Sequence, residues 1–356
     1  MEDLSASREN PQLVTEIPRF EDVIAMARPT TQSARPPFRI PRLNGILFVA
    51  TLLTTTMAGA EAAGAAVSIF HPLDTLLSLP AGLSFSIPLM SILLAHEMGH
   101  FLTARGYGVD TSLPYFIPAI MPVPIALGTF GAFIRMRSLP RSRRAMFDIG
   151  AAGPWAGFAV ALVAIVVGLK WSEIAPLDNS GGGIELGNSI IFWSVARVVL
   201  GVDPDSVNVN LHPTAFAGWI GLLVTTLNLL PVGQLDGGHV VYSLFGTRWH
   251  RRISRSVWLG CLLMVLVPKL LHLDYWPGWI MWFVLVLVLG LGHPVTQDAD
   301  TPLAGKRRLA AWATVLLFLV TFAPVPFSSV PPKSPLAPSA GPTFSVIYHV
   351  PPVRPR

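Results

Sequence analysis

The sequence is short of cysteine and of charged residues, and each shortage excludes a class of protein. Cys261 is the only cysteine in 356 residues, so the chain can form neither an intrachain disulfide nor a cage of thiolates around zinc. Any metal would have to be held by His and carboxylate side chains. Charged residues make up only 13% of the chain and hydrophobic residues 52%, with a mean hydropathy of +0.56. This composition excludes an ordinary soluble globular protein and indicates a polytopic membrane protein.

The net charge is small, at +5, and the basic residues gather at the ends of apolar segments. Lys and Arg in such places orient a chain in a lipid bilayer. We therefore expect the bilayer as the surroundings of this protein and expect no nucleic-acid partner.

The N-terminal residues 1–42 lack the apolar segment of a signal peptide and contain more acidic residues than a transit peptide does. They are rich in Pro and Ser, so we expect a flexible cytoplasmic tail. A transmembrane domain is expected over 43–325, with its core at 80–245, followed by a Pro-rich tail over 326–356. Because no transit peptide is evident, we expect the bacterial inner membrane, with a plastid membrane as the alternative.

Long apolar runs predict about seven transmembrane helices and therefore an all-α polytopic membrane protein. The predicted spans are 43–68, 82–106, 146–170, 212–232, 254–272, 276–292 and 308–325. Lys and Arg are alternately abundant and scarce in the connections between these spans. This alternation places the N-terminus in the cytoplasm and the C-terminus outside.

The most informative segment is HEMGH at 96–100, in the second predicted span. Two histidines four residues apart lie on the same face of a helix, so both imidazoles can bind one ion. The glutamate between them can act as general base on a metal-bound water. Glu97 is the only formal charge in residues 82–104, and ionisable groups inside a bilayer are costly and usually functional. We therefore predict one catalytic zinc ion on His96 and His100 rather than histidines that only pack.

A further apolar segment, 116–134, has 19 residues without a charge and is long enough to span a membrane. Pro118, Pro122 and Pro124 nevertheless make it a poor helix. Non-helical backbone survives at membrane depth only where protein or a water-filled cavity satisfies its hydrogen bonds. We therefore expect a re-entrant loop or hairpin beside the active site, with an eighth span as the alternative.

A catalytic zinc takes three protein ligands and leaves one position for water, so a third ligand is needed. Asp236 is the best candidate, because it follows the fourth predicted span and Pro and Gly interrupt the helix around it. The second and fourth spans run in the same direction, which brings the three ligands to similar depth on the cytoplasmic side. An eighth span at 116–134 would place Asp236 on the opposite face. Two alternatives stay open: Asp236 and Gly237 form a simple turn, or His239 is the ligand instead.

Two motifs together resemble the site-2 protease family of intramembrane zinc metalloproteases, namely HEMGH and NLLPVGQLDGG at 228–238. Other strings resemble its bacterial and plastid branch, which includes the chloroplast proteins named for ethylene-dependent gravitropism deficiency and yellow-green leaves. These strings are GTFGAFIRMRS at 128–138, FDIGAAGPWAGF at 147–158, GHPVTQDADTPL at 292–303 and FAPVPF at 322–327. The resemblance implies cleavage of a substrate transmembrane helix inside the bilayer. It also implies zinc on His96, His100 and Asp236, with Glu97 activating water.

In many members of that family the string GPxxN ends in Asn, whereas this chain has Gly157 at that position. No role of that Asn can be carried over, and Asn228 is the remaining amide near the predicted site. We hypothesise that Asn228 orients the substrate. Some relatives carry a PDZ domain between spans, but the longest connection here is about 40 residues and is too short for one.

These features predict an intramembrane zinc metalloprotease that acts on transmembrane segments of membrane proteins. An intact substrate helix hides its carbonyl groups in hydrogen bonds and must first unwind locally. The alternation around Thr129 and Gly131 indicates a strand edge for the extended substrate, or else a loop that only plugs the cavity. A catalytically silent zinc-binding scaffold or chaperone would not need Glu97. A transporter would show repeated halves, and neither motif occurs twice.

Overall fold

The computed structural model describes residues 41–65, 67, 71–119, 127–175, 183–203, 207–298, 301–330 and 346–348. All but the last two residues of the predicted N-terminal tail lie outside these ranges, as does most of the predicted C-terminal tail. Both tails therefore stay predictions.

The described residues are mainly helical, as the composition and the apolar runs predict. The helices are α2 Arg42–Ala62, α3 Pro72–Gly106, α4 Arg143–Lys170, α5 Ile190–Leu200, α6 Pro213–Asn228, α7 Asp236–Leu270, α8 Gly278–Leu289 and α9 Gly305–Thr321. A helix, or part of one, lies at each of the seven predicted spans. Four of the described helices, α2, α3, α4 and α7, are long and apolar enough to cross a membrane.

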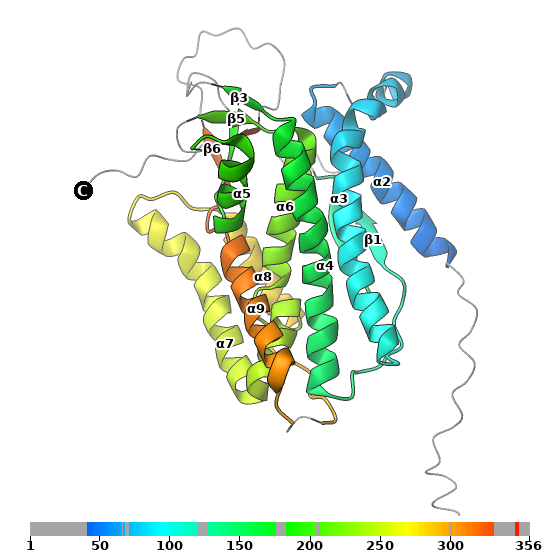
Figure 1. Ribbon diagram of the computed structural model, residues 1–356, viewed down its shortest axis with the longest axis vertical. Helices are drawn as coiled ribbons and strands as arrows, with labels where there is room; N and C mark the ends of the chain where they lie inside the picture. The colour runs from blue at the N-terminus through cyan, green and yellow to red at the C-terminus, as the bar shows by residue number, and fades with distance from the viewer. Residues whose placement is uncertain are drawn as a thin grey trace, which may run out of the picture. The chain divides into compact units, whose positions relative to one another are not determined.

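Helix α4 packs against both α3 and α6, and the three helices lie side by side (Figure 1). Glycines make these approaches close. A Cβ atom on Gly99 would lie 2.6 Å from the carbonyl oxygen of Ala152, and one on Gly168 would lie 2.1 Å from the backbone nitrogen of Ala215. Small residues of this kind let helix backbones approach in apolar surroundings, where tight packing rather than the hydrophobic effect drives helix association. The site described below lies on this glycine-lined contact.

Helix α7 consists of two helical parts joined at Gly246, whose φ of 76° and ψ of −179° are not helical. The second part returns alongside the loop that precedes α7, because His250 Nε2 lies 2.9 Å from the carbonyl oxygen of Gly233. The predicted span 254–272 falls in this second part, and the connection predicted before it is largely helical. Only a residue without a Cβ adopts the Gly246 conformation readily, so the reversal depends on that glycine.

Two strands replace the helix that an eighth span would require. Strand β1, Tyr115–Pro118, pairs antiparallel with β2, Thr129–Phe133, and residues 120–126 between them lie outside the described residues. Helix α2 holds both ends of this hairpin: the amide of Asn44 donates to the carbonyl oxygen of Pro114 at 2.8 Å, and Thr54 Oγ1 donates to that of Gly128 at 2.6 Å. The described part of 116–134 is thus a hairpin, and how deep it lies in a membrane stays a prediction.

A second sheet contradicts the purely α-helical class. Its five strands, in the order β3-β5-β7-β4-β6, are Glu173–Ala175, Asn208–Asn210, Val346–Tyr348, Gly183–Leu186 and Phe327–Val330. Three of them and helix α5 come from the long connection between α4 and α6, and two from the predicted C-terminal tail. The sequence reasoning missed them because strands of three or four residues are too short to show a period.

Candidate metal centre

His96 and His100 lie on one face of α3, as their spacing predicts. Their Nε2 atoms are 3.1 Å apart, and the two residues are only 4% and 6% exposed. Both rings therefore point at a common place inside the helical bundle rather than at its surface.

Asp236 reaches the same place from a different helix. It is the first residue of α7, and its Oδ2 atom lies 3.3 Å from Nε2 of His96 and 3.3 Å from Nε2 of His100. The two glycines after it allow this position, since a Cβ on Gly237 would lie 2.0 Å from the carbonyl oxygen of Leu229. Asp236 thus begins a helix packed tightly on its preceding loop, and its role as a ligand rather than as the cap of a turn stays a prediction.

The spacing of the three ligand atoms fits a tetrahedral zinc site. Zinc bonds to nitrogen and carboxylate oxygen are about 2.0–2.2 Å long, so ligand atoms at the corners of a tetrahedron lie about 3.3–3.5 Å apart. The observed separations of 3.1, 3.3 and 3.3 Å are close to this value. Within the described residues, His96, His100 and Asp236 form the only group of three such side chains close enough to hold one ion. His239 is not part of it, so the alternative with His239 as ligand is not supported.

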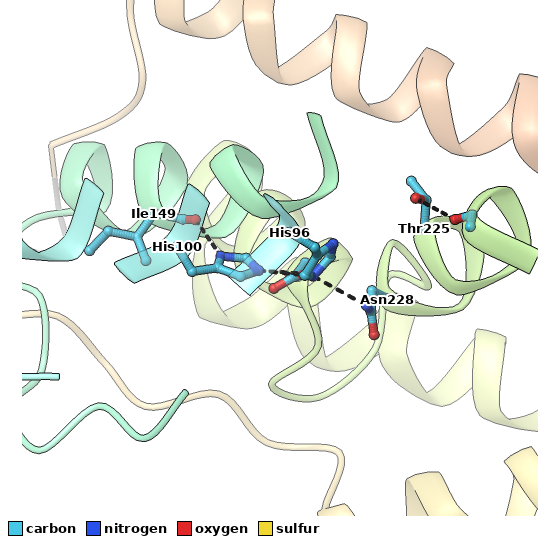
Figure 2. Close-up of polar contacts among 7 residues, drawn as sticks. His96, His100, Ile149, Thr225 and Asn228 are labelled. Atoms are coloured by element: carbon cyan, nitrogen blue, oxygen red, sulfur yellow. Dashed lines mark hydrogen bonds and ion pairs between the residues drawn. The ribbon is translucent and has the colours of Figure 1, made fainter. Parts of the chain in front are cut away.

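A backbone carbonyl sets the protonation of one ligand (Figure 2). His100 Nδ1 lies 2.8 Å from the carbonyl oxygen of Ile149 on α4. A carbonyl only accepts, so Nδ1 carries the hydrogen and the neutral ring keeps its lone pair on Nε2. This lone pair faces His96 and Asp236, as a metal ligand requires, and the hydrogen bond also fixes the plane of the ring.

Glycines on α4 make the room for both histidine rings. A Cβ on Gly153 would lie 2.1 Å from His100 Nε2, and one on Gly157 would lie 3.1 Å from His96 Cβ. Gly157, where the chain departs from the GPxxN string, therefore lies directly against a predicted zinc ligand. Gly150, Gly153 and Gly157 are three and four residues apart, so they lie on one face of α4. This spacing could have predicted a glycine-lined contact surface, but the sequence reasoning did not use it.

The predicted base, Glu97, is buried at 6% exposure, next to the strand β2. The backbone N–H of Ile134, the residue after β2, lies near its carboxylate, as do His96, His100 and Asp236. The carboxylate therefore lies between the predicted ligands of α3 and the hairpin. Sequence reasoning identified the base but not this neighbour.

The three predicted substrate-binding residues lie in different surroundings. Asn228, at the end of α6, places its amide nitrogen 3.3 Å from His96 Nε2, so it belongs to the site (Figure 2). Thr129 shapes β2: its hydroxyl donates to the carbonyl oxygen of Ile117 and accepts from the backbone N–H of Gly131, both at 2.9 Å. Thr129 and Gly131 therefore set the form of the hairpin, and their contact with a substrate stays a prediction.

Comparisons with known proteins find a matching family and several relatives. Residues 84–268 match Peptidase family M50. The chain is 27% identical over 258 residues to a probable chloroplastic zinc metalloprotease, EGY2, of Arabidopsis thaliana, which covers 71% of this chain and 43% of that protein. It is 38% identical over 170 residues to EGY1 of the same plant, covering 47% of this chain and 30% of the relative. EGY3 of Oryza sativa subsp. indica is 29% identical over 252 residues, or 64% of this chain and 39% of that protein.

The chain spans less than half the length of these curated relatives. The family match itself covers the predicted ligands, the predicted base and the hairpin between them. The chain therefore belongs to peptidase family M50.

Proposed function

We propose that this protein is an intramembrane zinc metalloprotease that hydrolyses peptide bonds in or near the transmembrane segments of other membrane proteins. The observation that carries the proposal is the convergence of His96, His100 and Asp236 on one place, beside Glu97, inside long apolar helices. Its relatives are named as probable zinc metalloproteases, which supports the same chemistry.

The residues of the site divide the reaction between them. Zinc, when bound to His96, His100 and Asp236, supplies a Lewis acid that polarises the scissile carbonyl and acidifies water. The carboxylate of Glu97 accepts the proton of the attacking water and then gives it to the leaving amine. The amide of Asn228 is near enough to the ligands to donate a hydrogen bond to the substrate backbone, which would orient it.

The seven-span topology, with a cytoplasmic N-terminus and a re-entrant hairpin, is part of the proposal. Helices at all seven predicted positions support it, although α6, α8 and α9 are shorter than a full span. The names of the relatives place those proteins in the chloroplast, which favours the plastid alternative over a bacterial inner membrane.

The edge of strand β2 that faces away from β1 supports a mode of substrate binding. Its two-stranded sheet has β1 on one side, and no described strand pairs with the other side. An unwound substrate segment can add to such an edge by backbone hydrogen bonds, which makes its carbonyl groups available for attack. Ile134, directly after β2, lies near the Glu97 carboxylate, so a segment lying along this edge would end close to the base.

Replacing Thr129 by valine is expected to weaken substrate binding about fivefold. The change keeps the shape of the side chain but removes the hydroxyl that ties Gly131 and Ile117 together, a loss of about 1 kcal/mol. The measurement is KM and kcat for a transmembrane peptide, with KM carrying the change. Thr111→Val is the matched control, because the Thr111 hydroxyl is buried without a hydrogen-bond partner. Equal kinetics for the two variants would favour a loop that only plugs the cavity.

The class of protein is tested by removing the metal. The purified chain in detergent is expected to contain one zinc, to cleave a transmembrane peptide, to lose this activity on chelation and to regain it with zinc but not with magnesium. Imidazole ligands favour zinc over magnesium, which prefers oxygen ligands and water. Bound zinc without any hydrolysis of several transmembrane peptides would instead support the silent scaffold. Hydrolysis that survives complete removal of zinc would contradict the proposal.

A further inference from the structure

Three histidines outside the ligand group are buried together behind the start of α7. They are His239 in its first part, His250 in its second part and His293 in the loop after α8, with exposures of 6%, 0% and 9%. The ring centroids of His239 and His293 are 4.9 Å apart, and those of His250 and His293 are 5.1 Å apart. The sequence reasoning placed no role on the segment GHPVTQDADTPL that contains His293, so its burial among these rings needs an explanation.

The hydrogen bonds of His293 show which ring nitrogen donates and which accepts. His293 Nδ1 lies 2.6 Å from the carbonyl oxygen of Pro294, so this nitrogen carries a hydrogen. Burial, with a smaller effect of His239, lowers the pKa of His293 to about 3, and the ring is neutral at physiological pH. Its Nε2 therefore accepts a hydrogen bond, and His239 Nδ1, at 2.7 Å, is the donor.

The loop segment 293–298 is fastened to α7 at a second point. The ring of Tyr242 stacks on that of His293 with centroids 4.1 Å apart, and its hydroxyl accepts from the backbone N–H of Thr296 at 3.0 Å. The backbone N–H of Asp298 also donates to the carbonyl oxygen of Arg141, just before α4. The segment is thus tied both to the first part of α7 and to the start of α4, the helix that lines the metal centre.

The first turn of α7 packs closely on the preceding loop but has no side-chain hydrogen bond at its cap. The residue before Asp236 offers no side-chain hydrogen bond to cap the helix, and the two residues after Asp236 are glycines. His239 is therefore the first side chain after Asp236 that can anchor this turn, and it lies three residues on, on the same helix face. On the other side of Asp236, Gly233 is held by His250 and Ser254, at 2.9 and 3.2 Å.

We propose that the segment 293–298 is a positioning element for the third metal ligand: the hydrogen bond from His239 to His293 fixes the first turn of α7 so that the Asp236 carboxylate stays within reach of His96 and His100. The inference rests on the proposed zinc site. His293 is not part of the metal group and bonds to His239, so it acts on Asp236 only through His239. Partners of this kind, one step removed from a ligand, typically change metal affinity by about 10–100-fold when they are removed.

The test compares His293→Asn with His293→Gln in the full chain. Glutamine reaches as far as the histidine Nε2 position and can accept from His239, whereas asparagine reaches only the Nδ1 position. Zinc affinity is measured by competition with a chelator, and the cobalt-substituted proteins are compared by visible absorption, which reports ligand geometry. His272→Asn is the control, because His272 is exposed and its φ of 54° is tolerated by asparagine.

We expect His293→Asn to bind zinc about tenfold more weakly than wild type, with an altered cobalt spectrum. His293→Gln and His272→Asn should both stay within about threefold of wild type. Wild-type affinity in His293→Asn would overturn the inference. So would equal losses in both His293 variants accompanied by equal losses in the melting temperature of the zinc-free proteins, since these would show a purely structural role.

Thr296→Val and Tyr242→Phe keep the test decisive if His293→Asn does not fold. Each removes the 3.1 Å hydrogen bond between the Tyr242 hydroxyl and Thr296 Oγ1 and leaves both histidines in place. Each should weaken zinc binding a few-fold while the zinc-free melting temperature changes little. Unchanged zinc affinity in both would also overturn the inference. If wild type itself bound no zinc, the proposed function would fail instead, so the two failures are distinguishable.

Discussion

Replacing Glu97 by glutamine is expected to reduce peptide hydrolysis by about 10²–10⁴-fold while zinc remains bound. Glutamine has the same shape as glutamate but cannot accept a proton from water at neutral pH. Glu97 is not part of the group of three side chains close enough to hold one ion, so the substitution leaves that group intact. Zinc content and cleavage of a transmembrane peptide are measured on the same preparations.

Glu97→Asp is the matched control for this experiment. It keeps a proton acceptor but draws it back by one methylene group, so its rate should lie between those of wild type and Glu97→Gln. All three proteins should contain the same amount of zinc. A Glu97→Gln enzyme as fast as wild type would exclude Glu97 as the base, and zinc loss in that variant alone would mean that Glu97 helps to hold the metal.

Replacing Gly153 by alanine is expected to weaken zinc binding about a hundredfold or more. The new Cβ would lie 2.1 Å from His100 Nε2, whereas ordinary contacts begin near 3.4 Å. The ring or helix α4 would have to move by roughly 1 Å, although zinc–ligand distances tolerate deviations of only about 0.2 Å. Zinc affinity by chelator competition is the measurement, and loss of activity at limiting zinc should follow it.

Alanine substitutions at two other glycines provide a graded comparison for Gly153→Ala. Gly157→Ala places its Cβ 3.1 Å from His96 Cβ, so a small shift suffices and a mild loss of zinc affinity is expected. Gly260→Ala, in the second part of α7, meets no atom within 4 Å and should bind zinc as wild type does. Zinc affinity should therefore be highest in Gly260→Ala, lower in Gly157→Ala and lowest in Gly153→Ala. A Gly153→Ala protein with wild-type affinity would contradict the contact of α4 with His100.

The predicted elements close to the chemistry were accessible from the sequence because they depend on local geometry. Two histidines four residues apart share a helix face whatever the rest of the fold does, which is why His96 and His100 converge as predicted. The three prolines in 116–134 likewise disfavour a helix through their own backbone, and the described part of this segment is a hairpin. The seven helical positions follow from apolar runs, since a long apolar segment is stable in lipid only when its backbone bonds are satisfied internally.

The remaining features depend on which surfaces meet, and no local pattern encodes that. Whether Asp236 is a ligand or part of a turn depends on the approach of α7 to α3. The reversal at Gly246, the second sheet and the buried pair His239 and His293 all join residues far apart in the chain. The hydrogen bonds that form these features join backbone atoms or single side chains of separate segments. Such contacts leave no periodic pattern in the sequence.

The sequence by itself determined the chemical groups of the candidate site and the helix face that carries two of its ligands, because both follow from residue type and from a spacing shorter than two helical turns. Only the tertiary structure decided that the carboxylate lies beside them, that α4 has glycine where it meets the rings, and that a distant loop contacts the first turn of α7. Those outcomes are set by distances between separate helices, and such distances result from the packing of the whole helical bundle.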